Sequence, residues 1–189
     1  MNGLVVIFPG IGYNSSRPLL YYLKKMVKKL GFDTVIEVEY KDLVFDKGNL
    51  IKDKEAQKEI FKKCLSCARD CLSNVNWKEY ESVLFISKSI GTIAASAMEN
   101  ELKDVKIKQI LLTPLEETFQ FPVKNAVGFI GNVDPWSRYE RVMELALENR
   151  IPMHTYEGAN HSIETGDVRT DIDYLKNVME IADSFISSK

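Results

Sequence analysis

Short runs of Val, Ile, Leu and Phe alternate along the chain with longer stretches in which apolar residues recur every three or four positions. The short runs are typical of strands buried on both faces of a parallel sheet, and the longer stretches are typical of amphipathic helices. Strands are predicted over residues 4–8, 34–39, 83–87, 107–113, 126–130 and 151–156. The alternation predicts an α/β fold of three layers: an open twisted parallel sheet of about six strands with helices on both faces.

Helices are predicted in the intervals between these strands. The interval after the first strand carries an apolar stripe that Ser15 or Ser16 is expected to cap and Gly31 to end. The stripe consists of Leu19, Leu20, Leu23, Met26, Val27 and Leu30. Further helices are predicted over 55–72, 89–102, 138–148 and 171–186, and residues 41–54 read as a polar connection.

Length and charge limit the domain count and the partners. A chain of 189 residues with 45% hydrophobic content can bury one sizeable core, so residues 1–189 are expected to form one domain. The net charge of −2 provides no basic field for nucleic acid. Residues 1–8 lack a basic leader region, and their apolar run is too short to span a bilayer, so a cytoplasmic protein without a membrane partner is expected. The oligomeric state stays open.

The three cysteines, Cys64, Cys67 and Cys71, lie close together in one predicted helix. Their odd number and the lack of a distant partner argue against a disulfide framework. Their spacing of three and four residues puts them on one helix face with apolar neighbours, and neither histidine is near in the sequence. Core thiols are therefore favoured over a metal site.

A serine lies between a predicted strand and a helix of small residues in the segment Ser87-Lys88-Ser89-Ile90-Gly91-Thr92. A sharp turn from strand to helix needs small residues two positions before and after its centre, and Ser87 and Gly91 meet this need. The segment resembles the nucleophile elbow, G-x-S-x-G, of the alpha/beta-hydrolase superfamily, with Ser87 in place of the first glycine. The resemblance implies that Ser89 is a nucleophile; the alternative is an ordinary N-cap serine.

Two later loops resemble those that carry the acid and the base of this superfamily. Asp134 follows the fifth predicted strand in Gly131-Asn132-Val133-Asp134-Pro135, although an Asp before Pro can also simply initiate a turn. His161 follows the last strand in Gly158-Ala159-Asn160-His161, whereas the other histidine, His154, lies inside a predicted strand. The order serine, aspartate, histidine is that of the superfamily.

The loop after the first strand, Phe8-Pro9-Gly10-Ile11-Gly12-Tyr13, lies where the superfamily has its oxyanion loop. The resemblance implies that the amide of Ile11, or of Gly10, acts with that of Ile90 to bind an oxyanion. A phosphate-binding loop is the alternative, but the third glycine or the lysine that such loops require is absent.

The resemblance covers almost the whole chain and is strongest to the compact dienelactone-hydrolase-like and small esterase branches. It implies a serine hydrolase that acts on a small ester or thioester through Ser89, His161 and Asp134, with no metal or organic cofactor. Gly10, Tyr13 and Trp136 are expected to contact the substrate. An acyltransferase with the same three residues, or a binding protein without turnover, are the alternatives. Residues 114–125 are too few for a lid domain, although Leu115, Phe119 and Phe121 could form a small apolar wall beside Ser89.

Overall fold

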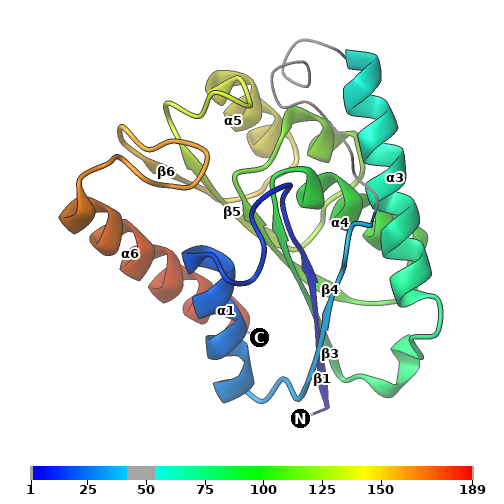
Figure 1. The fold of residues 1–189 in the computed structure, drawn as a ribbon. Helices are drawn as coiled ribbons and strands as arrows, with labels where there is room; N and C mark the ends of the chain where they lie inside the picture. The colour runs from blue at the N-terminus through cyan, green and yellow to red at the C-terminus, as the bar shows by residue number, and fades with distance from the viewer. Residues whose placement is uncertain (1, 42–53, 189) are drawn as a thin grey trace.

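Six strands pair in parallel in the order β2-β1-β3-β4-β5-β6 (Figure 1). The computed structural model describes residues 2–41 and 54–188, so nearly all of the polar connection predicted over 41–54 lies outside the described residues. All six predicted strands are confirmed; the two edge strands are shorter than expected. The strands are β1 (Gly3–Phe8), β2 (Thr34–Glu37), β3 (Ser82–Lys88), β4 (Ile107–Leu112), β5 (Ala126–Gly131) and β6 (Met153–Tyr156).

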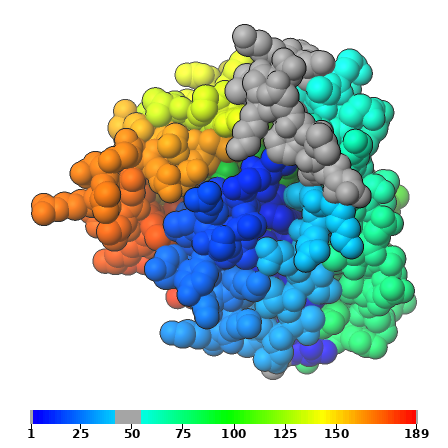
Figure 2. All heavy atoms as spheres, in the orientation of Figure 1, coloured from blue at the N-terminus to red at the C-terminus, as the bar shows by residue number. Residues whose placement is uncertain are grey.

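Helices cover both faces of this sheet (Figure 1). Side chains alternate between faces along each strand, so Val5 and Ile7 of β1 pack under one layer of helices and Leu4, Val6 and Phe8 under the other. The first layer is α1 (Pro18–Lys29) and α6 (Val168–Ser187), which pack against each other; in Figure 2 the early, blue segment lies beside the late, orange one. The second layer is α3 (Lys54–Leu72), α4 (Ile90–Glu101) and α5 (Tyr139–Glu148), with the short 3₁₀ helices η1 (Trp77–Glu79) and η2 (Glu116–Gln120) in the connections.

The start of α1 differs from the prediction. Neither Ser15 nor Ser16 caps the helix: Arg17 occupies the cap position without a side-chain bond, and Pro18 begins the helix. Proline has no amide hydrogen and a φ already suited to the first turn, so this start needs less side-chain capping. The predicted end is confirmed, because Gly31 follows the last turn with a φ of 89°.

The cysteine prediction holds for one end of α3 and is wrong for the other. Cys64 is fully buried against α4, in a cluster with Ile90 and Ile93, and Cys67 is half-buried. Cys71 is exposed, because the last turn of α3 lies beside the edge strand β2, with its Sγ atom 3.9 Å from the carbonyl of Glu37. Among the described residues, no group of three or more His, Cys, Asp or Glu side chains is placed to hold a metal ion, and no described helix is long and apolar enough to cross a membrane.

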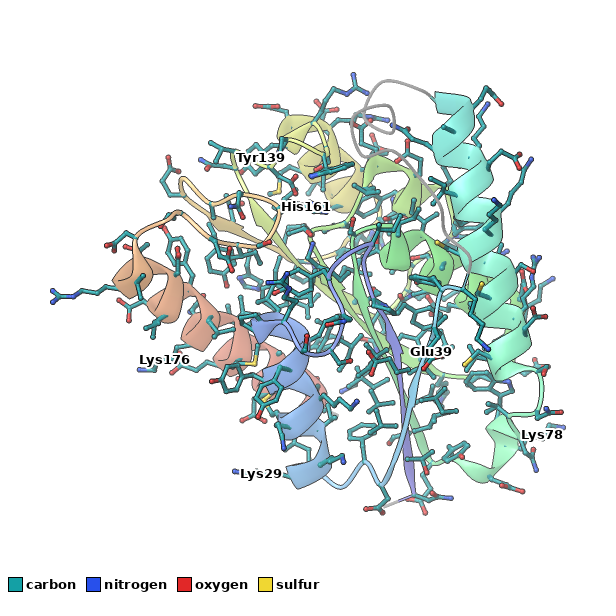
Figure 3. All side chains as sticks on the ribbon, viewed as in Figure 1. Lys29, Glu39, Lys78, Tyr139, His161 and Lys176 are labelled. Carbon is teal, nitrogen blue, oxygen red and sulfur yellow. The ribbon has the colours of Figure 1, made fainter. Side chains whose placement is uncertain are left out.

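The topology brings two loops together at the carboxyl ends of the strands. The chain passes from β1 to β2 on one side and later enters β3 on the other side of β1. Loops after β1 and β3 therefore lead to opposite faces of the sheet, and ligands of open parallel sheets usually bind at such a point. Figure 3 shows His161 near this end of the sheet, whereas Lys29 and Lys78 lie toward the opposite end.

Candidate functional site

Ser89 joins β3 to α4 in a strained backbone conformation. Its φ of 56° and ψ of −126° lie in a region that residues other than glycine rarely adopt. The amide of Ser89 donates to the carbonyl of Leu112 at 3.0 Å, and its own carbonyl accepts from the amide of Thr92 at 2.8 Å. Ser89 occupies the cap position of α4, but its side chain makes no capping hydrogen bond. The alternative of an ordinary N-cap serine is therefore excluded.

The small residues around Ser89 are required by the close approach of β1. A Cβ atom on Gly91 would lie 2.2 Å from the carbonyl oxygen of Phe8 and 2.5 Å from that of Pro9, far inside contact distance. Ser87 is fully buried, and its hydroxyl donates to the carbonyl of Ile110 at 3.1 Å. Serine is thus accommodated at the position where the superfamily usually has glycine.

Three side chains from three strand ends form a continuous line of hydrogen bonds. The Oγ atom of Ser89 lies 2.8 Å from Nε2 of His161, and Nδ1 of His161 lies 2.6 Å from Oδ2 of Asp134. A carboxylate can only accept, so Nδ1 carries the proton and Nε2 accepts from the serine hydroxyl. The Asp134 side chain is 0% exposed and that of His161 18% exposed, so the aspartate end of the line is closed to water.

Asp134 also performs the turn-forming role that the sequence left open. Its Oδ1 atom accepts from the amide of Trp136 at 2.8 Å while Oδ2 contacts His161. Both carboxylate oxygens are therefore occupied, and the two interpretations of Asp134 are compatible.

The loops that carry Asp134 and His161 are bonded to each other. Asn132 accepts from the amide of Gly158 at 2.7 Å, and its Nδ2 donates to Glu157 at 2.8 Å. A Cβ atom on Gly131 would lie 2.0 Å from the carbonyl oxygen of Ala159, so glycine is needed where the two loops meet. These contacts fix the distance between the two loops.

In the loop after β1, one backbone amide is hydrogen-bonded within the loop, and another has no acceptor among the described residues. Gly10 and Tyr13 exchange two backbone hydrogen bonds of 3.1 Å, so the amide of Gly10 is already satisfied. Among the described residues the amide of Ile11 has no such acceptor, and Ile90 is the first residue of α4, whose amide has no acceptor within the helix. This arrangement favours Ile11 over Gly10 as the partner of Ile90, and the oxyanion role of both stays a prediction.

Comparisons with known proteins bear on the fold. No protein-family model matches the chain, and no curated protein does. Solved structures do match: an esterase of Pyrococcus furiosus is 14% identical, with TM-score 0.67 over 98% of this chain and 82% of that one. An α/β serine hydrolase without a lid from Xanthomonas campestris is 13% identical, with TM-score 0.62 over 99% and 84%. Est1E of Butyrivibrio proteoclasticus, with ferulic acid bound, is 12% identical, with TM-score 0.67 over 98% and 90%.

The chain has the alpha/beta-hydrolase fold. Within the described residues this hydrolase fold carries no lid domain, since the connection from β4 to β5 contains only η2. Leu115 and Phe121 of this connection pack beside Ile90, next to Ser89, as predicted for an apolar wall. Phe119 does not, because its ring is buried in a different cluster with Val123 and residues of α5.

The three residues predicted to contact substrate differ in accessibility. Trp136 is 39% exposed, and its ring lies 5.9 Å from that of His161. Gly10 is buried against Ser89, and the Tyr13 side chain is buried with its hydroxyl accepting from the amide of Leu19 at 3.2 Å. Of these three residues, only Trp136 presents a side chain to solvent beside the hydrogen-bonded line.

Burial governs the electrostatics of the site. Burial, aided by the charge of Lys88, lowers the pKa of His161, while Asp134 acts in the opposite direction. Burial also lowers the pKa of Lys88 to about 7. The other histidine, His154, stacks on Phe129 with ring centroids 5.5 Å apart, as expected for a packed ring in a strand.

Two kinds of residue in the site were not predicted from the sequence. Asn132 ties the two loops together through side-chain bonds that depend on the fold. The role of Lys88 was not predicted either, and a lysine at the end of a largely apolar strand was the available signal.

The approach of α4 to β1 gives a test of the elbow. Gly91→Ala should lower the free energy of unfolding by about 3 kcal/mol, because the new methyl group meets backbone that cannot move aside. Urea unfolding measures this change. Ser96→Ala on the same helix is the control: Ser96 is fully buried with no hydrogen-bond partner for its hydroxyl among the described residues, so its loss should be nearly neutral. Equal stabilities of the two variants would contradict the close approach.

Proposed function

We propose that the protein is a serine hydrolase that cleaves a small ester or thioester, with Ser89 as nucleophile, His161 as general base and Asp134 as the acid that orients the histidine. The observation that carries the proposal is the unbroken line of hydrogen bonds, 2.8 Å and 2.6 Å, from Ser89 through His161 to Asp134. The line begins at a strained residue, and backbone strain of this kind persists where the surrounding structure enforces it, often at active sites.

The proposed reaction proceeds through an acyl-enzyme. His161 Nε2 takes the proton of Ser89 as Oγ forms a bond to the substrate carbonyl carbon, and the amides of Ile11 and Ile90 bind the resulting oxyanion. The tetrahedral intermediate collapses, the bond to the leaving group breaks, and His161 returns the proton to it. Water, deprotonated by His161, then attacks the acyl group, and Ser89 regains its proton.

The protonation of His161 suits this role. A histidine must be neutral at Nε2 to accept a proton, and burial, which lowers the pKa of His161 below its usual value, favours that neutral form. Asp134 holds Nδ1 protonated and so leaves Nε2 free to face Ser89. The same alignment supports turnover over a binding role, since binding alone would not require it.

A nucleophile test with a matched control decides between catalysis and binding. Ser89→Ala should reduce hydrolysis of nitrophenyl acetate by roughly 10⁴-fold or more and abolish labelling by a fluorophosphonate, because among the described residues no other hydroxyl is hydrogen-bonded to His161. Ser87→Ala, two residues away, should keep most of the activity and lose only about 1 kcal/mol of stability with the bond to Ile110. Equal losses in the two variants would rule out Ser89 as the nucleophile.

The second test concerns the acid. Asp134→Asn should fold normally, because its remaining oxygen can still accept from the amide of Trp136. Its amide group, placed against Nδ1, favours the wrong histidine tautomer and should lower kcat by up to about 10⁴-fold. Circular dichroism and steady-state kinetics measure the two effects, and wild-type kinetics would exclude Asp134 as the acid.

The third test concerns substrate size. With only η2 between β4 and β5, the described residues offer little apolar surface to cover a long chain beside Ser89. We expect kcat/KM on acetyl and butyryl esters to exceed that on long-chain esters, with no activation at an oil–water interface. A series of nitrophenyl esters of increasing chain length measures this, and a preference for the longest members would contradict it.

A further inference from the structure

A lysine is buried directly beside the nucleophile. Lys88, the last residue of β3, is 1% exposed, and its side chain lies on the sheet face that α1 and α6 cover. Removing an ammonium group from water is unfavourable unless other groups compensate. An apolar side chain at this strand position would avoid that penalty, so the lysine calls for a role other than packing.

The contacts of Lys88 hold its charge in one place. Its Nζ donates to the Oγ1 atom of Thr113 at 2.5 Å and lies 5.0 Å from the centre of the Tyr13 ring. A Cβ atom on Gly10 would lie 3.3 Å from Cγ of Lys88, so the stem of the lysine packs under the loop after β1. Within residues 2–41 and 54–188 Lys88 forms no ion pair. Its positive charge is therefore not neutralised by a contacting carboxylate, and it can influence titratable groups nearby.

Thr113 is itself held in an unusual conformation. It is fully buried with a φ of 43°, which a β-branched residue rarely adopts, and its amide donates to the carbonyl of Phe129 at 2.7 Å. This turn at the end of β4 presents the hydroxyl to Lys88. The lysine thus has a built acceptor rather than a chance contact.

The charges that face Lys88 come from the two loops of the proposed triad. The carboxylate of Asp134, from the loop after β5, and that of Glu164, from the loop after β6, favour the protonated lysine. The lysine in turn opposes protonation of His161, which also faces Asp134, the hydroxyl of Ser89 and the ring of Trp136. Lys88 and His161 are therefore two buried bases competing for positive charge beside one buried carboxylate.

We propose that Lys88 is a positioning residue: its buried ammonium, held by Thr113 and Tyr13, keeps His161 in the neutral form that can accept the proton of Ser89. The catalytic consequence rests on the proposed function. Asp134 alone would bias His161 toward the charged form; burial opposes that bias, and Lys88 adds to the effect of burial while leaving the bond from Nδ1 to Asp134 intact. The pKa of Lys88, about 7, lies above the lowered pKa of His161, so the lysine carries most of its charge where His161 titrates.

The direct test is the titration of His161 in the 189-residue chain. The chain has two histidines, so NMR of ring-labelled protein gives two resolvable titrations, with His154 as internal reference. Lys88→Met should raise the pKa of His161 by roughly half a unit to one unit, because one nearby positive charge is lost. Lys108→Met is the matched control: Lys108 bonds to the carbonyls of Phe185 and Ile186 at the far end of β4, so the pKa of His161 should stay at its wild-type value.

A second variant decides the matter if Lys88→Met does not fold. Thr113→Val keeps the shape and β-branching of the side chain but removes the oxygen that accepts from Lys88, so the lysine loses protons more readily. The pKa of His161 should then rise by less than in Lys88→Met. An unchanged pKa of His161 in the folded Lys88→Met protein, or in Thr113→Val where that protein does not fold, would overturn the proposal.

Kinetics separates this proposal from the proposed function. The acidic limb of kcat/KM for nitrophenyl acetate should move to higher pH in Lys88→Met by the same shift as the NMR titration. A shifted titration with an unshifted limb would overturn the catalytic part of the proposal. A wild-type protein that neither hydrolyses esters nor reacts with a fluorophosphonate would overturn the proposed function, while the NMR titration would still decide whether Lys88 controls His161.

Discussion

The close packing of α4 against the end of β1 is the constraint on which the site depends. Because Gly91 has no side chain, α4 can begin directly over the carbonyls of Phe8 and Pro9, and the chain must turn at Ser89 without an intervening loop. The strain at Ser89 is a result of this packing, and the many buried contacts of β1, β3 and α4 sustain it. The same turn places the first amide of α4 beside the loop after β1, so the proposed nucleophile and the proposed oxyanion site arise from one feature.

The remaining parts of the site depend on the sheet in a different way. Asp134 and His161 come from consecutive loops after neighbouring strands, β5 and β6, and the bonds of Asn132 join those loops. Ser89 is carried by β3, two strands away from β5. The acid and the histidine therefore form one locally stabilised unit, and the sheet sets its distance from the serine.

Much of this could be predicted from the sequence, because strand periodicity and the positions of residues after strand ends are local signals. Such signals predict the six strands and the packed ring of His154. They also predict that Ser89, Asp134 and His161 lie at the carboxyl ends of the strands. Two of the errors depend on which neighbouring element a residue lies beside. The exposure of Cys71 depends on the edge strand beside α3, and the direction of Phe119 depends on the short turn η2. The partners of Lys88 lie 25 residues away and on the loop after β1, so no local pattern could reveal them.

The double use of Asp134 has a consequence for how the site responds during a reaction. With Oδ1 held by the amide of Trp136 and Oδ2 by His161, the carboxylate cannot rotate without breaking a bond. If positive charge forms on the imidazole, as in the proposed reaction, the Asp134 carboxylate that stabilises it is already in place. In the proposed reaction the pair of Asp134 and His161 would therefore need little reorganisation energy, because the amide of Trp136 already fixes the carboxylate.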